Sequence, residues 1–396
     1  MTSDKRYRIL LICNSYPPVL GGSEVEAQRM SVALIRRGHR VHVLCAGGPP
    51  MPAVRDWIDP AGVPVSILTR NSRGRRRDLV FAFEVTWTLW RERHNYDLVY
   101  FLMQGLHVVP ALRTAHFLGK PSVMKISGDG IINLMSSSRI GRLELRWLRQ
   151  WNVPVMVLND SMVAEALRNG FPREQLTWMP NPVDIDEFCP APPEEVARWR
   201  KDHGIPTAAP VVIYTGRLSH EKGLVPLLRG YALAAQTTPG CMLVLVGDGP
   251  MRTELEQLAR ELNLGPEQLK FTGRVDGKEV PCWLQASDVF ALTSPNEGFS
   301  CALVEAMAAG LSSVVSAIPA NQQLIAEGVH GLTVPFDNVE AISQAFLRLF
   351  HDPGLCCRMG QAARQRAIDN YSTIRVVERY EALFSKAPQS AHGSQR

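Results

Sequence analysis

The sequence has few of the features that mark membrane-spanning, zinc-binding or low-complexity proteins. No apolar run approaches the roughly 20 residues of a membrane-spanning helix. The first apolar run, residues 9–13, is too short for the apolar core of a signal peptide. None of the eight cysteines has the C-x2-C spacing of a zinc site, and several lie in apolar runs, as reduced core thiols do. We therefore expect a cytoplasmic protein with no metal site.

Charge is unevenly distributed along the chain. Residues 1–185 contain 24 Lys and Arg against 15 Asp and Glu, whereas the remainder contains 19 against 23. This asymmetry indicates that only the first half meets an anionic partner. Because the chain lacks regular aromatic spacing and any nucleic-acid-binding motif, we expect no nucleic acid partner.

Strand and helix patterns alternate through both halves of the 396 residues. Expected strands include 8–13, 41–45, 98–102, 122–126, 155–158, 211–215, 242–247 and 288–292. Such alternation is typical of parallel sheets covered on both faces. Five prolines between residues 179 and 196 indicate a linker. We expect α/β domains at 1–185 and 186–368, a helix at 369–386 and a disordered tail at 387–396.

The segment 294–310, SPNEGFSCALVEAMAAG, places two glutamates in a strand–loop–helix pattern. After a short buried strand at 288–292, we expect Glu297 in the loop and Glu305 in a helix that ends before Gly310. Such a loop offers free backbone N–H groups and the positive end of a helix dipole, which suit a phosphate or a polyhydroxylated ligand. Two solvated charges would be the simpler interpretation of this segment alone.

A second loop carries two cations. It follows the strand at 211–215, begins at Gly216 and ends at Gly223, with Arg217 and Lys222 between them. Arginine can bind two oxygens of a diphosphate at once, while lysine acts as a point charge. An isolated loop of this kind would more simply be a solvated basic loop.

Two further loops also follow strands and could contact a ligand. Gly21 and Gly22 follow the first strand and precede a helix, so they could hold phosphate, although paired glycines often form an ordinary turn. Arg274 and Val275 follow a strand in the second half. Ligands of such sheets bind at the carboxyl ends of the strands.

In their order along the chain, these elements resemble the retaining glycosyltransferases of the GT-B fold, family 4. The matching strings are the glycine pair at 21–22, Asn181-Pro182-Val183-Asp184, GRLSHEKG from Gly216, and E-x7-E from Glu297. The resemblance implies an α/β fold of two Rossmann-like domains whose parallel sheets face each other across a cleft. It also implies that the last helix returns to the first domain.

The resemblance further implies a function and site residues. A sugar would pass from a nucleotide diphosphate sugar to a glycan, lipid-linked or small-molecule acceptor, with retention and without a metal or other cofactor. Arg217 and Lys222 would neutralise the leaving diphosphate, and Glu297 would bind donor-sugar hydroxyls. Donor-binding residues would be Gly21, Gly22, Gly216, Arg274, Val275, Gly298, Phe299, Ser300 and Glu305, with Glu305 on the ribose.

One position departs from the family. Ser127 stands where many members have a histidine, and His107 lies elsewhere. Ser127 or Asp129 could contact the sugar or acceptor instead. Asn159 matches a family position that faces the cleft, and we expect His39 to be a surface turn residue. A nucleotide-sugar epimerase, a phosphorylase and a non-catalytic nucleotide-sugar binding protein remain as alternatives.

Two basic features of the first half remain. Residues 70–77 form a loop-like arginine cluster, and a helical stripe of arginines lies beside an apolar one: Arg139, Arg142, Arg146 and Arg149, then Ile140, Leu143, Trp147 and Trp151. Such a helix can lie on an anionic membrane, which would place the protein at the inner face of a membrane. We favour the alternative that the apolar stripe packs on the core and the arginines are solvated.

Overall fold

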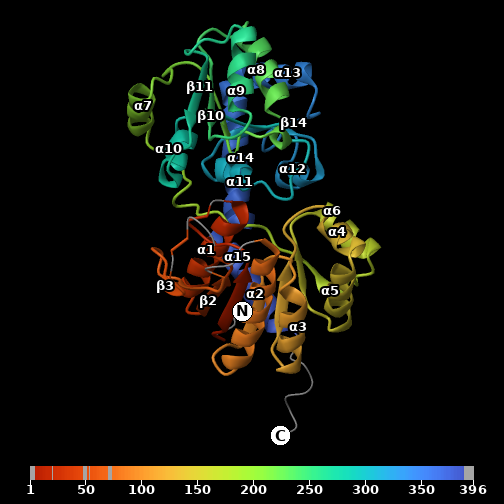
Figure 1. Ribbon diagram of the computed structural model, residues 1–396. Coiled ribbons are helices and arrows are strands. Elements are labelled where there is room, and N and C mark those ends of the chain that lie inside the picture. Colours follow the sequence, from red (N-terminus) through yellow and green to blue (C-terminus); the bar gives the residue numbers. More distant parts are fainter. Residues whose placement is uncertain (1–4, 20, 48–50, 53, 70–73, 388–396) are drawn as a thin grey trace. The chain divides into compact units, whose positions relative to one another are not determined.

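The computed structural model describes residues 5–19, 21–47, 51–52, 54–69 and 74–387. The chain forms two compact α/β units (Figure 1). Unit 1 consists of Met1–Pro182 and Thr373–Arg396, and unit 2 of Val183–Ser372. Residues 388–396 of the expected tail lie outside the described residues.

Unit 1 contains an eight-stranded sheet in the order β3-β4-β2-β1-β5-β6-β7-β8. Its strands are β1 (Arg8–Cys13), β2 (Arg40–Cys45), β3 (Asp56–Ile58), β4 (Pro64–Ile67), β5 (Leu98–Phe101), β6 (Ser122–Lys125), β7 (Val155–Val157) and β8 (Leu176–Trp178). All neighbours are parallel except β3 and β4. Its helices are α1 (Gly22–Arg36), α2 (Gly74–Arg91), α3 (Val108–Phe117), α4 (Ile131–Ser137), α5 (Arg139–Gln150), α6 (Asp160–Arg168) and α15 (Thr373–Lys386).

Unit 2 contains a six-stranded parallel sheet in the order β11-β10-β9-β12-β13-β14. Its strands are β9 (Val211–Thr215), β10 (Met242–Val246), β11 (Leu269–Gly273), β12 (Val289–Leu292), β13 (Ser312–Ser316) and β14 (Leu332–Val334). Its α-helices are α7 (Pro193–Asp202), α8 (Leu224–Ala235), α9 (Arg252–Glu261), α10 (Val280–Gln285), α11 (Cys301–Ala308), α12 (Pro319–Leu324), α13 (Val339–His351) and α14 (Pro353–Tyr371). The near-continuous apolar runs of β9, β10 and β12 are fully buried, as expected of strands covered on both faces.

The last helix, α15, belongs to the core of unit 1. Tyr380 and Phe384 are buried with residues of β1 and α1, and the hydroxyls of Tyr100 and Tyr380 are 2.9 Å apart. The expectation for His39 was wrong. It is buried, its Nδ1 accepts a hydrogen bond from the Tyr7 backbone N–H, and its Nε2 lies 3.2 Å from the Glu381 carboxylate. The reason is that α15 covers the turn in which His39 lies.

Two expectations for the basic segments of unit 1 were also wrong. Residues 74–77 of the arginine cluster form the first turn of α2, while 70–73 lie outside the described residues. On α5, Ile140 and Leu143 are exposed, because the buried stripe is made of Gly141, Glu144, Leu145 and Leu148 instead. Within the described residues, no helix is both long enough and apolar enough to cross a membrane.

Candidate functional site

The loops that follow β9, β10 and β12 approach one another closely at the carboxyl edge of the unit 2 sheet. A Cβ atom on Gly223, whose φ is +64°, would lie 2.1 Å from the carbonyl oxygen of Thr293. A Cβ atom on Gly247, whose φ is +133°, would lie 2.0 Å from the carbonyl oxygen of Gly216. Only glycine fits at both positions, so the backbone itself holds the three loops together.

This packing brings together the predicted catalytic residues Lys222 and Glu297, which are 75 positions apart. The Lys222 ammonium donates a hydrogen bond to Glu297 Oε1 at 2.8 Å, and the two side chains are 27% and 9% exposed. Arg217 is exposed on the same loop, and its carbonyl oxygen accepts a hydrogen bond from the Tyr214 hydroxyl. The carboxyl edge of the unit 2 sheet therefore presents two cations and a mostly buried carboxylate.

The predicted strand–loop–helix around Glu297 is confirmed. β12 ends at Leu292, Glu297 lies in the loop, and α11 carries Glu305 in a half-buried position. The Ser300 hydroxyl caps α11 by accepting a hydrogen bond from Leu303 N–H at 3.2 Å. Its side chain therefore orients the helix start, and the O–H of the hydroxyl is not used by this cap. The Phe299 ring packs edge-on against Tyr371, 6.1 Å between centroids.

The other predicted donor-binding residues of unit 2 follow β11, the edge strand. Arg274 is exposed and Val275 half-buried. The Gly247 N–H donates to the Gly273 carbonyl oxygen at 3.0 Å, which joins this turn to the loop after β10. The strand order β11-β10-β9-β12 thus places Arg274 on the same edge as Lys222.

The glycine pair of unit 1 lies beside Glu24, at the start of α1. Glu24 is buried, and its carboxylate accepts hydrogen bonds from the hydroxyls of Ser15 and Ser23. A Cβ on Gly21 would lie 2.3 Å from Glu24 Oε2, whereas one on Gly22 would meet open space. Gly21 thus lies against the flexible end of the Glu24 side chain, and the predicted phosphate contact of the pair stays a prediction.

Ser127 and Asp129 follow β6 at the carboxyl edge of the unit 1 sheet. The Ser127 hydroxyl donates to the Leu102 carbonyl oxygen at 3.2 Å. Burial raises the pKa of Asp129, and its Oδ1 has no hydrogen-bond partner among the described residues. Asn159, after β7, is buried and accepts a hydrogen bond from Met162 N–H, so its side chain caps α6. Asp129 is thus the better candidate for a ligand contact.

His107 lies in the loop after β5, which neighbours β6. Burial lowers its pKa to about 4, so the ring is neutral. Its Nε2 has no hydrogen-bond partner among the residues that the structure describes. His107 and Ser127 follow adjacent parallel strands, so their loops lie at the same edge of the sheet.

A buried lysine was also missed. Lys125, at the end of β6, is fully buried and its ammonium contacts Glu26 of α1 and Asn181 Oδ1, the latter at 2.6 Å. The available signal was a charged residue inside an otherwise apolar strand, because lysine is almost never fully buried unless paired. Lys125 fixes the start of α1 and the segment before the unit boundary to the sheet.

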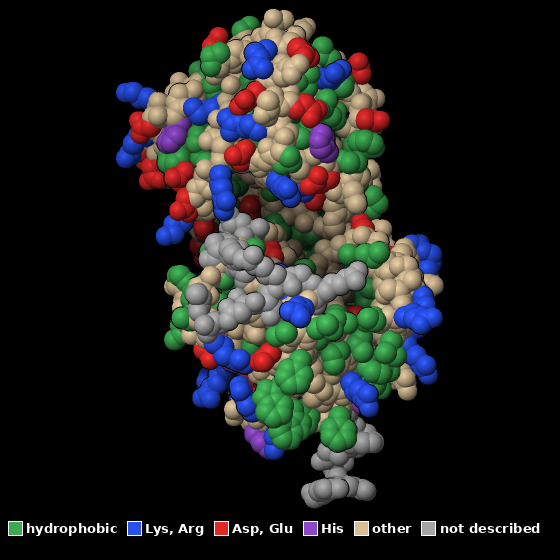
Figure 2. All heavy atoms as spheres, viewed as in Figure 1, with side chains coloured by type: hydrophobic (Ala, Val, Ile, Leu, Met, Phe, Trp, Pro, Cys, Tyr) green, Lys and Arg blue, Asp and Glu red, His purple; other side chains and the backbone are tan. Residues whose placement is uncertain are grey.

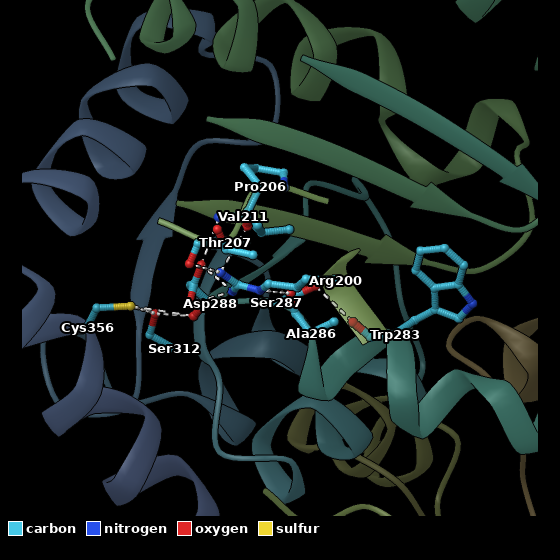
Figure 3. Close-up of polar contacts among 10 residues, drawn as sticks. All are labelled: Arg200, Pro206, Thr207, Val211, Trp283, Ala286, Ser287, Asp288, Ser312 and Cys356. Atoms are coloured by element: carbon cyan, nitrogen blue, oxygen red, sulfur yellow. Dashed lines mark hydrogen bonds and ion pairs between the residues drawn. The ribbon is translucent and has the colours of Figure 1, made fainter. Parts of the chain in front are cut away.

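The hollow at the other, amino edge of the unit 2 sheet has a structural explanation (Figure 3). Its volume is about 510 Å³, and it includes Arg200 and Asp288. Arg200 donates to both Asp288 oxygens at 3.1 and 3.0 Å and to the Ala286 carbonyl, while Val211 N–H donates to Asp288. These paired charges attach α7 to β9 and β12. No cluster of three metal-ligating side chains occurs among the described residues.

Comparison with known proteins identifies the family. Residues 20–187 match the model described as Glycosyltransferase Family 4, and residues 195–366 match Glycosyl transferases group 1. Together the two matches span most of the chain, and the protein belongs to the group 1 glycosyltransferases.

Curated relatives align over nearly the full length. The N-acetyl-alpha-D-glucosaminyl L-malate synthase of Bacillus anthracis is 23% identical over 93% of this chain and 94% of its own. The 2-deoxystreptamine glucosyltransferase of Streptomyces kanamyceticus is 25% identical over 92% of this chain and 99% of its own. Among solved structures, HepE of Anabaena in complex with UDP has a TM-score of 0.80 at 21% identity, covering 96% of this chain and all of its own. This likeness confirms the GT-B fold.

Proposed function

We propose that the protein is a retaining, metal-independent glycosyltransferase that uses a nucleotide diphosphate sugar. The observation that carries the proposal is the 2.8 Å hydrogen bond from Lys222 to Glu297 at the carboxyl edge of the unit 2 sheet, where the loop after β9 also carries Arg217. A diphosphate and a sugar are joined in one donor molecule, so a site that handles both needs cations and a hydroxyl-binding carboxylate side by side. This edge offers both.

In the proposed reaction, the bond from the anomeric carbon to the diphosphate breaks, and a bond to the acceptor oxygen forms on the same face. The acceptor proton passes to the leaving diphosphate. Arg217 and Lys222 stabilise the charge that grows on the diphosphate, and cations placed in advance lower the barrier because this charge is largest in the transition state. Glu297 both orients Lys222 and accepts hydrogen bonds from sugar hydroxyls.

The donor class is supported by what similar proteins bind. HepE structures contain UDP or UDP-glucose, and a Mycolicibacterium smegmatis mannosyltransferase that matches half of this chain is named as GDP-mannose-dependent. The shared chemistry is a nucleoside diphosphate linked to a hexose. On this chain, Glu305 is proposed to bind the ribose, and Arg274 and Val275 to lie beside the base.

The test is a panel of UDP-, GDP- and ADP-hexoses with candidate acceptors, measuring release of nucleoside diphosphate and the anomeric configuration of the product. We expect acceptor-dependent release with retention. Arg217→Ala should abolish most of it, whereas Arg198→Ala, at an exposed position on α7, should not. Inversion at the anomeric carbon would contradict the proposed mechanism.

The same panel separates the alternatives. An epimerase would change the sugar without releasing the nucleotide. A phosphorylase would require inorganic phosphate. A non-catalytic binding protein would bind the donor but would not turn it over. Arg217→Ala would then weaken donor binding, and the wild type itself would show no transfer rate.

We also propose peripheral contact of unit 1 with an anionic membrane. Its support is that Arg139, Arg142 and Arg146 of α5 are exposed together with Ile140 and Leu143. A basic helix with an exposed apolar side is suited to the surface of a bilayer that carries negative headgroups.

A further inference from the structure

Helix α2 is apolar on two opposite sides. Its inner side is buried in unit 1 through Phe81, Val85 and Leu89. Its outer side carries four large residues that are 61%, 67%, 45% and 48% exposed, in the order Leu79, Phe83, Trp87 and Trp90. The side of a surface helix that faces away from the core normally carries charged and polar residues. The outer side of α2 therefore has the composition of a covered surface.

The outer residues form one continuous surface. At about 100° per residue, the four lie within roughly 80° of one another around the helix. Trp87 and Trp90 stack with their ring centroids 5.4 Å apart. Phe117, at the end of the neighbouring helix α3, is 82% exposed. We call Leu79, Phe83, Trp87, Trp90 and Phe117 the α2–α3 face.

Positive charge surrounds this face. Arg76 and Arg113 are exposed on α2 and α3, and the guanidinium of Arg93 lies 4.9 Å from the centre of the Trp90 ring. On the same side of unit 1, hydrophobic side chains gather over α2 and α3, with lysine and arginine side chains beside α5 (Figure 2). The acidic residues of α2 nearest to these four, Asp78 and Glu84, lie roughly 100° or more from the centre of the outer side.

We propose that the α2–α3 face docks on an anionic lipid bilayer, with its aromatic rings in the interfacial layer and the surrounding arginines on the headgroups. Tryptophan is enriched at this depth because its ring is amphipathic, and arginine can keep its charge in water while its stem lies on apolar surface. The inference rests on the proposed membrane contact and assigns its apolar part to α2 and α3.

A second copy of the chain is the competing occupant. In a symmetric dimer each face meets the same face of its partner, so the arginines around one face would approach the arginines around the other. Like charges brought together in this way disfavour association. An anionic bilayer instead supplies the opposite charge over the whole face, and charge complementarity therefore selects lipid.

The experiment is co-sedimentation of the full chain with vesicles of phosphatidylcholine alone or mixed with phosphatidylglycerol. We expect binding to the mixed vesicles only, weaker at high salt. Phe83→Ser/Trp87→Ser should reduce binding by about tenfold or more, because two large apolar groups would no longer leave water. Ile58→Ser/Leu233→Ser, which removes exposed apolar residues elsewhere, should bind as the wild type does.

Each outcome is decisive. If the wild type binds neither vesicle at low salt, the membrane contact and its assignment both fall. If Arg142→Gln/Arg146→Gln lowers binding but Phe83→Ser/Trp87→Ser does not, the contact stands and the α2–α3 face is the wrong surface. Self-association that the serine variant abolishes, without vesicle binding, would show an interface between copies. Turnover of soluble donor should be unchanged in the serine variant, so this test is independent of the catalytic proposal.

Discussion

The pair formed by Lys222 and Glu297 supports the sharpest prediction, because it separates a catalytic role of the lysine from a structural one. Replacing Lys222 with methionine keeps an unbranched side chain that is one atom shorter, and it removes the charge. Losing one preorganised charge partner costs a factor of about one hundred or more in turnover, equivalent to roughly 3 kcal/mol of transition-state stabilisation. The exposed Lys201→Met serves as the control and should retain wild-type turnover.

Stability should respond differently. With Glu297 only 9% exposed, removal of its partner leaves a mostly buried carboxylate unpaired, at a cost of about 1–3 kcal/mol in the free energy of unfolding. Lys222→Met/Glu297→Gln should lose about 1 kcal/mol less than the sum of the single changes, because the pair is partly shielded from solvent. Turnover of the double variant should stay as low as that of Lys222→Met.

The assays are donor turnover at saturating substrate and urea unfolding of the four proteins in the cycle. Recovered turnover in the double variant would mean that Lys222 only neutralises Glu297. Turnover of Lys222→Met within about threefold of the wild type would remove the lysine from the leaving-group role, since an essential charge partner contributes far more.

Three further predictions follow from the site and its scaffold. Gly223→Ala should lower the free energy of unfolding by more than about 3 kcal/mol, because φ is +64° and the new Cβ would collide with the backbone of Thr293. The control Gly204→Ala, also at φ +64° but facing open space, should lower it by only about 1 kcal/mol. Urea unfolding midpoints measure both changes. Burial raises the pKa of Glu144 to about 8, so the folded state binds a proton that the unfolded state has released, and stability should fall by about 2–4 kcal/mol as pH rises from about 4.5 to about 8. Glu144→Gln should flatten this slope, and Glu174→Gln, at an exposed position, should leave it unchanged. Transfer activity should persist in excess chelator, and a complete loss that added metal restores would contradict the proposed reliance on two side-chain cations.

Local patterns predicted the elements of the site well, because strand, loop and helix are encoded by neighbouring residues. The loop position of Glu297, the helical position of Glu305 and the left-handed Gly310 all followed from one short segment. Long-range contacts could not be predicted in this way. His39 was expected at the surface, since nothing near it in sequence reveals Glu381, 342 positions away.

The dependence on contacts between distant parts of the chain also explains the wrong prediction for the buried side of α5 and other missed features. On α5, two apolar stripes are compatible with the sequence, and only the neighbouring helices decide which one is buried. Strands β3, β4 and β8 were not expected. Their sequences, DWI, PVSI and LTW, mix polar residues or proline with apolar ones, whereas the equally short β7 is entirely apolar and was expected. The contact of Glu24 with Gly21 depends on a side-chain position that no spacing rule specifies.

The return of α15 has a consequence for how the chain folds during synthesis. Unit 2 is one continuous segment, whereas unit 1 needs both ends of the chain. While the ribosome is still adding residues up to Ser372, β1 and α1 lack Tyr380 and Phe384, and the apolar surface that these rings will cover is still open to water. The segment made last therefore completes the domain begun first. A chain that stops before Thr373 would leave an unfinished core for chaperones and proteases to recognise.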